Sequence, residues 1–286
     1  MAPPSFLSRL PHPHLTHALR DGALVKALVA EFLGVMFFQL LAGSVTHGPV
    51  ETAAAFAAIM YFTSHISGGH LNPVVSLAAA GTGHIDLVRG VLYAVVQILG
   101  AIVGAILQVW LVYGNAFGKT SDSCFSPPRH VTGPQLWGWE FLLTFLFLAV
   151  MYSALFIAPG HGSAAPLAAG LALLAALSTG GFYTGGSPLN PARVLANMLV
   201  FRCGTAWGWS YLAAHLAAVG AAVAWVWPVH GLGMYMGGEN PAAFTGTGRE
   251  LGGTGLTDPL MGGMGSGVTG GRGIAADPAG AGTGYV

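Results

Sequence analysis

Two short stretches decide how this chain folds: HISGGHLNPVVSL at residues 65–77 and YTGGSPLNPARVL at residues 183–195. Each carries a Gly-Gly pair, then an Asn-Pro dipeptide, then an apolar segment that is compatible with a helix. Asn is a favoured N-cap and Pro is favoured at the first helical position, so each Asn-Pro predicts a helix start. One Asn-Pro would indicate only a cap, but two in the same setting indicate a repeated structural device.

The apolar segments that follow the two dipeptides are too short to cross a membrane. As helices, residues 73–80 and 191–200 would rise about 1.5 Å per residue, which spans only half of a hydrocarbon core about 30 Å thick. Non-helical backbone at membrane depth is tolerated only where protein buries it or water bathes it. We therefore expect two re-entrant loops, each followed by a half helix, that face an aqueous path.

The composition of the 286 residues indicates a membrane protein. Hydrophobic residues make up 53% and charged residues 7%, whereas a soluble domain carries roughly 25% charge. A spanning helix needs about 20 mostly apolar residues. Six candidates lie at roughly 23–43, 51–67, 87–113, 136–158, 164–182 and 206–228. The expected fold is an all-α membrane protein with six transmembrane helices and two half helices.

The chain also contains an internal repeat. VAEFLGVMFF at 29–38 resembles WEFLLTFLFL at 139–148, and each segment places a glutamate, Glu31 or Glu140, near the start of a first helix. Repeat one covers about 23–113 and repeat two about 136–228, within a channel domain at 23–228. Three spans per repeat is an odd number, so the halves enter from opposite sides and meet at the midplane. Residues 1–22 are expected to be flexible, and the glycine-rich residues 229–286 to be a disordered tail.

Inverted half helices give the midplane a definite chemistry. Each helix N-terminus carries about half a positive elementary charge, which opposes cations, including hydronium. The side-chain amides of Asn72 and Asn190 offer N–H donors to the pore. A water molecule whose oxygen faces both donors cannot continue a proton-conducting chain. The sequence therefore predicts a passive channel for uncharged molecules.

With these motifs and glutamates, residues 23–228 resemble the aquaporin, or major intrinsic protein, family. The resemblance implies a homotetramer in the lipid bilayer, with one pore per subunit for water and for small neutral solutes such as glycerol, urea, ammonia or hydrogen peroxide, excluding protons and ions. It implies a pore midpoint formed by Asn72, Pro73, Val74, Asn190, Pro191 and Ala192. It places the outer constriction at Thr52, Leu177 or Ser178, Gly186 or Ser187, and Arg193, with Arg193 repelling cations. Glu31 and Glu140 are expected to support the loops by accepting backbone hydrogen bonds, and His70 to pack within its loop.

The sequence departs from the family pattern in ways that affect the solute range. The first motif ends in Val74 rather than Ala, and the second loop is one residue longer, which leaves two constriction positions open. Water-selective members have Phe and His at the first two constriction positions, where this chain has Thr52 and Leu177 or Ser178. Glycerol conductors have Asp where Val194 stands. We expect water to be the main permeating molecule, followed by small neutral solutes.

The sequence allows one other function and argues against several more. Glu31 and Glu140 could instead serve a proton-linked secondary transporter. No nucleophile–base pair or metal-ligand spacing supports an enzyme or a cofactor, and the zero net charge predicts no nucleic-acid partner. Two cysteines, Cys124 and Cys203, are too few for a disulfide framework and are expected to be free thiols.

The distribution of basic residues predicts the orientation. Arg9, Arg20 and Lys26 precede the first span and Arg89 follows the second, which places both termini in the cytoplasm by the positive-inside rule. Lys119 and Arg129, in the loop after the third span, favour the opposite orientation.

Overall fold

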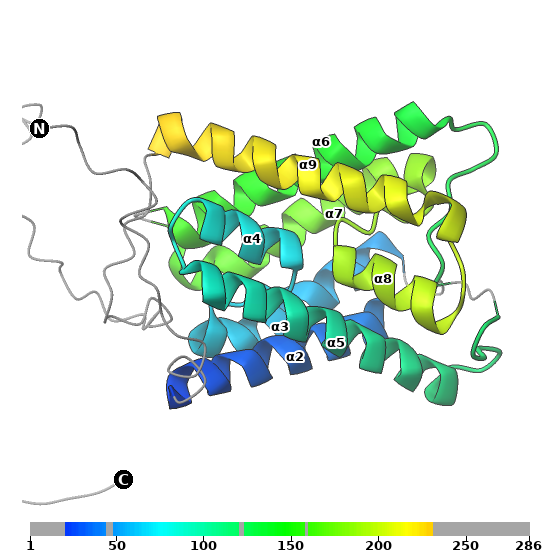
Figure 1. The fold of residues 1–286 in the computed structure, drawn as a ribbon, viewed down its shortest axis with the longest axis horizontal. Coiled ribbons are helices and arrows are strands. Elements are labelled where there is room, and N and C mark those ends of the chain that lie inside the picture. Colours follow the sequence, from blue (N-terminus) through cyan, green and yellow to red (C-terminus); the bar gives the residue numbers. More distant parts are fainter. Residues whose placement is uncertain (1–20, 44–47, 120–122, 158–159, 231–286) are drawn as a thin grey trace, which may run out of the picture. The chain divides into compact units, whose positions relative to one another are not determined.

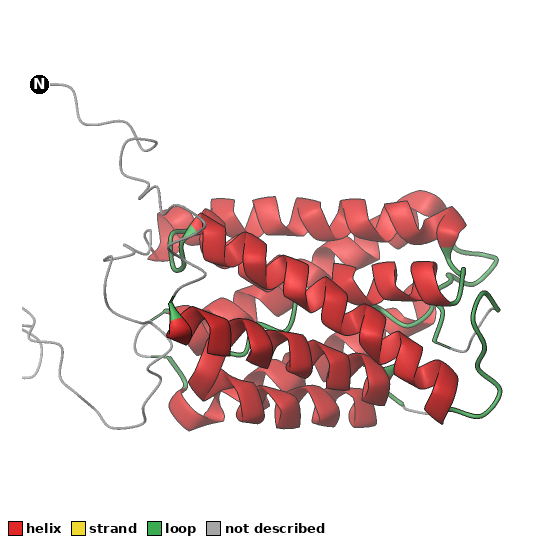
Figure 2. Ribbon diagram, turned by 60° about the horizontal axis from the view of Figure 1, so that its bottom comes forward, coloured by secondary structure: helices red, strands yellow, loops and turns green. Residues whose placement is uncertain are grey.

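The computed structural model describes residues 21–43, 48–119, 123–157 and 160–230, and every regular element within these ranges is a helix (Figures 1 and 2). The long helices are α2 (Gly22–Ala42), α3 (Pro49–Ser67), α5 (Leu87–Leu111), α6 (Gly133–Met151), α7 (Ala165–Thr184) and α9 (Thr205–His230). Two short helices, α4 (Pro73–Gly81) and α8 (Pro191–Val200), begin at the prolines of the two motifs. A π turn, Tyr152–Phe156, extends α6, and a 3-10 turn, Gly162–Ala164, precedes α7. The expected all-α fold is confirmed.

Five helical segments are long and apolar enough to cross a membrane by length and composition. They are Gly22–Ala42, Leu87–Leu111, Gly133–Phe156, Gly162–Thr184 and Thr205–Val229. The sixth long helix, α3, has 19 residues but is more polar, because it carries Glu51, Thr63 and His65. Most of the flexible N-terminus and nearly all of the glycine-rich tail that the sequence predicts, residues 1–20 and 231–286, lie outside the described residues.

The two halves of the described chain repeat the same contacts. Helix α2 packs against α3 and α5, and α6 packs in the same way against α7 and α9. Helices α3 and α7 pack together where the halves meet. Each half helix contacts the third long helix of the other half, α4 with α9 and α8 with α5. In Figure 1, α4 lies toward the end of the bundle where α2 starts and α9 finishes, and α8 lies toward the opposite end.

Small residues permit the closest of these helix contacts. On α5, a Cβ at Gly100 or Gly104 would overlap the backbone oxygen of Phe32 or Met36 on α2. Small residues allow membrane helices to approach until their backbones touch, which compensates for the absence of a hydrophobic driving force in lipid. The two glycines therefore fix the α2–α5 pair that carries Glu31.

Cys124 and Cys203 form a disulfide bond, so the expectation of two free thiols is wrong. The two residues are 79 positions apart in sequence. The loop between α5 and α6 brings the first to the turn between α8 and α9, where the second lies. The count of two cysteines argues correctly against a framework of several bridges, but it carries no information about a single bridge closed by the fold.

Candidate pore

Both re-entrant loops turn through left-handed backbone. Gly68 and Gly185 end α3 and α7 with φ of 94° and 67°. The residue before each asparagine is a leucine with positive φ, 54° at Leu71 and 50° at Leu189. A left-handed conformation costs a residue with a Cβ about 1–2 kcal/mol, so neighbouring groups must hold these leucines in place.

Glu31 holds the first loop from α2. One carboxylate oxygen accepts the His70 backbone N–H at 2.9 Å, and the other accepts the Leu71 N–H at 2.6 Å. The Ser67 hydroxyl and the Gln97 side-chain amide also donate to this carboxylate, at 2.6 and 2.8 Å. The side chain is completely buried. The carboxylate thus accepts four hydrogen bonds, and two of them pair backbone N–H groups that the loop would otherwise leave unpaired.

Glu140 holds the second loop from α6 in a corresponding way. Its carboxylate accepts the Leu189 backbone N–H at 3.4 Å and the Ser187 hydroxyl at 3.1 Å. A ring nitrogen of His215 lies 2.9 Å from the same carboxylate. Only one backbone N–H donates here, whereas two donate to Glu31. The second loop is also tied to its own helix end, because the Ser187 N–H donates to the Thr184 hydroxyl at 2.8 Å.

Asn72 and Asn190 join the two loops at the centre of the bundle. The side-chain amide of Asn72 donates to the Leu189 carbonyl at 2.9 Å, and that of Asn190 donates to the Leu71 carbonyl at 3.0 Å. Each side-chain oxygen accepts the backbone N–H two residues further on, which caps α4 or α8. An asparagine amide carries two N–H donors, so each residue has a second donor to offer to a solute.

The remaining midpoint residues pack around this pair. Pro73 and Pro191 open the half helices, and Val74 and Ala192 follow them with no exposed surface. His70 lies against the rings of Tyr93 and Phe156 and has a ring nitrogen 3.1 Å from the Ser76 hydroxyl. His70 thus has two aromatic neighbours and a polar partner on α4.

A cavity of about 430 Å³ opens at the end of the bundle where the α5–α6 loop lies, and we call it the outer cavity after the predicted outer constriction. It is lined by residues of the predicted constriction, Thr52, Leu177, Ser178, Gly186 and Arg193. Ser187 turns away from this set, because its hydroxyl bonds to Glu140. Of the two alternatives left open in the second loop, Gly186 therefore faces the cavity. Leu177 is 7% exposed, whereas the neighbouring Ser178 is exposed.

Arg193 is buried beside this cavity on the first turn of α8. Its guanidinium donates to the Ala42 carbonyl at 2.8 Å and to the Gln39 side-chain oxygen at 3.4 Å. The guanidinium carbon also lies 4.9 Å from the ring centre of Phe38 and 5.2 Å from that of Phe125. No carboxylate lies within ion-pair distance of it among the described residues. The side chain is therefore held by neutral groups, and no counter-ion among the described residues offsets a positive charge on it beside the cavity.

A second cavity, of about 330 Å³, lies at the opposite end of the described bundle. His65, His70, His84 and Arg89 line it, together with Phe156 of the π turn. The paired asparagines and the re-entrant loops lie between the two cavities. The described residues thus form two basins separated by the midpoint.

The sequence reasoning missed two residues, one that lines the outer cavity and one that ties the loop beside it. Phe125 reaches it from the α5–α6 loop, and Asn197 on α8 links Gln39 to that loop. Neither lies in a recognisable motif. The only local signal is the adjacent Cys124, because a disulfide from that cysteine would fix the position of the loop that carries Phe125.

Comparisons with known proteins agree with this geometry. The profile of the family described as Major intrinsic protein matches residues 18–227. Aquaporin TIP2-3 from Zea mays is 33% identical over 194 residues, which cover 60% of this chain and 75% of that protein. Aquaporin-5 from Mus musculus is 30% identical over 183 residues, covering 60% and 68%. The X-ray structure of the aquaglyceroporin from Plasmodium falciparum shares the fold, with a TM-score of 0.61 and 22% identity over 72% of this chain and 96% of that one. Since the family profile spans most of the sequence, the chain belongs to the major intrinsic protein family.

Proposed function

We propose that this integral, multi-pass membrane protein is a passive channel for water and, after water, for small neutral solutes such as glycerol, urea, ammonia or hydrogen peroxide. The supporting observation is the reciprocal pair of hydrogen bonds between each asparagine and the opposite loop, at 2.9 and 3.0 Å. These bonds fix two amide groups at the meeting point of two helix N-termini. The relatives named above, aquaporins from a plant and a mammal, are consistent with water as the first solute.

Exclusion of protons and ions follows from charge and orientation. The N-termini of α4 and α8 both direct positive partial charge toward the midpoint. The second N–H of Asn72 and of Asn190 orients the oxygen of a passing water and interrupts the proton-conducting chain. Arg193 adds a full positive charge at the outer cavity, where it would repel cations before they reach the midpoint.

The solute range depends on the outer constriction, for which we propose Thr52, Leu177, Gly186 and Arg193. Thr52 and Leu177 carry no ring, and Gly186 has no side chain. A wall built from these residues alone would be wider and less polar than one with Phe and His, and would admit molecules larger than water. Val194 stands where glycerol conductors have an aspartate, so we propose water as the main solute and the larger neutral molecules as secondary ones.

Stopped-flow light scattering of proteoliposomes tests this function. With sucrose as an impermeant osmolyte, vesicles that contain the protein should shrink faster than empty vesicles without any ion gradient. Glycerol or urea as osmolyte should then give a second phase of re-swelling if these solutes pass. Water flux equal to that of empty vesicles would refute the channel.

A proton-linked transporter is the alternative, and the contacts of its candidate acids disfavour it. Glu31 and Glu140 are both completely buried, and each carboxylate is engaged by the loop it supports. A carboxylate whose oxygens hold a re-entrant loop in place is poorly suited to load and release a proton, because each cycle would disturb the hydrogen bonds that hold the loop. In the vesicle assay, flux that required a proton gradient would favour the transporter.

We also propose the assembly and orientation of the protein. Large apolar side chains are exposed on the outer faces of the described helices, among them Val29, Leu99, Leu146, Leu171 and Leu216. These faces are suited to contact lipid and, in a homotetramer, to contact neighbouring subunits. Cross-linking in native membranes tests the tetramer.

The disulfide supports the orientation. It lies at the end of the bundle opposite the start of α2 and the end of α9. Disulfides persist on the oxidising side of a membrane, so this end would face away from the cytoplasm and both termini would face it. Protease protection of tags placed at either terminus tests this orientation.

A further inference from the structure

The outer cavity has an aromatic wall that comes from a loop rather than from a helix. Phe125, in the α5–α6 loop, lines the cavity and is 8% exposed. Its ring centre lies 5.2 Å from the guanidinium carbon of Arg193. On its other side the ring packs against Tyr211 of α9, with 6.3 Å between ring centres. A phenyl group therefore occupies the side of the cavity next to Arg193.

Glycines in the facing segments make room for this loop. A Cβ at Gly186 would lie 3.0 and 3.2 Å from two carbons of the Phe125 ring, and a Cβ at Gly204 would lie 2.9 Å from the Phe125 backbone oxygen. A Cβ at Gly185 would overlap the backbone of Ser126. All three glycines have positive φ. The ring therefore fills the space that a side chain at Gly186 would otherwise occupy.

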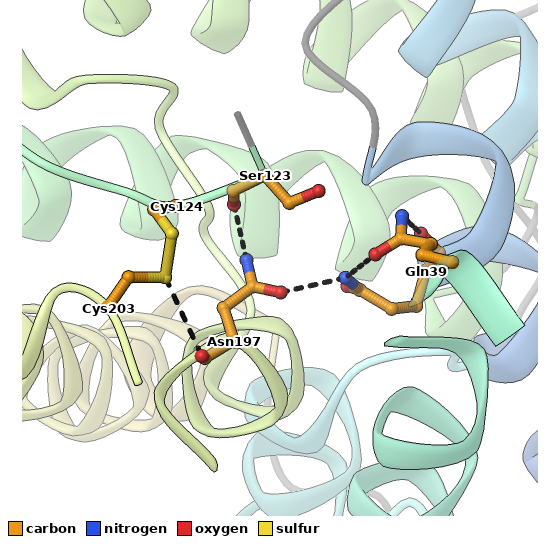
Figure 3. The surroundings of a disulfide bond; sticks show 6 residues. Gln39, Ser123, Cys124, Asn197 and Cys203 are labelled. Carbon is orange, nitrogen blue, oxygen red and sulfur yellow. Dashed lines mark hydrogen bonds between the residues drawn. A yellow bond between two sulfur atoms is a disulfide. The ribbon is translucent and has the colours of Figure 1, made fainter. Parts of the chain in front are cut away.

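Two anchors hold the residues just before Phe125 (Figure 3). The disulfide ties Cys124 to Cys203, and the side-chain amide of Asn197 donates to the Ser123 carbonyl. The Asn197 side-chain oxygen accepts from the Gln39 amide at 2.9 Å. The Gln39 oxygen in turn accepts from Arg193 at 3.4 Å. The Asn197 anchor is thus connected to Arg193 through Gln39.

We propose that Phe125 is a specificity-determining side chain of the outer constriction and that the Cys124–Cys203 disulfide positions it there. The proposal rests on the proposed channel function. Since Thr52, Leu177 and Gly186 leave the constriction wide, the phenyl ring supplies the bulk that they lack. Removing the ring, or releasing the loop that carries it, would widen the pore beside Arg193 and admit larger neutral solutes.

Reduction offers a way to release the loop without changing a residue. A membrane-impermeant dithiol attacks one sulfur as its thiolate and forms a mixed disulfide. Its second thiolate then displaces the first sulfur, leaving two protein thiols and a cyclic oxidised reagent. Two electrons and two protons pass from the reagent to the protein. The cavity is lined by Cys124, which is partly exposed, so a small reagent can reach the bond.

The test compares glycerol and water permeabilities of proteoliposomes. Phe125→Ala should raise the glycerol-to-water permeability ratio several-fold, and Phe125→Tyr, which keeps the ring, should not. Phe117→Ala is the matched control, because Phe117 lies in the same loop, is 57% exposed and does not line the cavity. The unmodified protein should show the same rise after treatment with dithiol, as should the double variant Cys124→Ser/Cys203→Ser without it.

Several results would overturn the proposal. An unchanged ratio in Phe125→Ala with water flux present would show that the ring does not set the solute range. An unchanged ratio after reduction, with both thiols confirmed by mass spectrometry, would show that the disulfide does not position the ring. If Phe125→Ala does not fold, Phe125→Leu and the reduced native protein decide the question. Failure of the proposed function is distinct, because the untreated native protein would then give no water flux.

Discussion

Replacing Glu31 by Gln and Glu140 by Gln should have very different consequences, although the two residues occupy matching places in the two repeats. At Glu31 each carboxylate oxygen accepts a backbone N–H, one from His70 and one from Leu71. A glutamine has only one side-chain oxygen, and its NH₂ group can only donate. Whichever way the amide turns, one backbone N–H of the first loop faces another donor.

The magnitude follows from the number of groups left unpaired. A buried donor without an acceptor costs about 1–3 kcal/mol, and the remaining bonds also lose the strength that the charge gave them. We expect Glu31→Gln to lower the free energy of unfolding by about 2–4 kcal/mol.

Glu140→Gln should be tolerated much better. Only the Leu189 N–H donates to Glu140 from the backbone, and the amide oxygen can take the place of the oxygen that accepts it. The NH₂ group then faces the Ser187 hydroxyl, which can turn and accept. The expected loss is about 1 kcal/mol or less, since no buried backbone donor is left unpaired.

Both variants can be measured against the native protein by titration with sodium dodecyl sulfate in mixed micelles. The fluorescence of the 7 tryptophans reports the folded fraction. Equal losses for the two variants would refute the reasoning, as would a Glu31→Gln protein that unfolds at the native midpoint. In either case the left-handed leucines would have to be held by something other than their glutamates.

Other predictions concern the helix contact, the constriction and the midpoint. Gly100→Val should prevent α2 and α5 from closing and lower the yield of folded protein in size-exclusion chromatography, whereas Gly138→Ala, with no neighbour within 4 Å, should behave like the native chain. Arg193→Ala should leave folding largely intact but admit larger solutes or protons, read from vesicle swelling and an internal pH dye; unchanged selectivity would remove Arg193 from the constriction. Asn72→Asp places a negative charge between the two helix N-termini and should raise cation conductance in planar bilayers, and a conductance equal to that of the native protein would contradict the electrostatic barrier.

Much of the fold could be predicted because its signals are local. Length and hydropathy mark the spans, and the Asn-Pro dipeptides mark the starts of α4 and α8 where the structure has them. The polar α3 is the instructive case. The apolar run at 51–67 predicts a span there, yet α3 is not among the five helical segments that meet the criteria of length and composition for crossing a membrane.

The rest of the site depends on contacts that no local pattern encodes. The Cys124–Cys203 bridge and the position of Phe125 both require knowing where the α5–α6 loop returns to the bundle. The choice between Gly186 and Ser187 required knowing that the Ser187 hydroxyl bonds to Glu140. A loop one residue longer than its counterpart can place the extra residue on either side of a turn, and only the backbone geometry resolves it.

The reciprocal bonds at the centre also constrain the order in which the protein can mature. Asn72 finds its acceptor 117 residues further along the chain, and Asn190 finds its acceptor 119 residues back. During synthesis, the first loop enters the membrane long before its partner exists. The proposed barrier to protons can therefore form only after α8 has been made and has docked. A chain that stalls after the first three spans contains every residue of the first loop but lacks the partner loop.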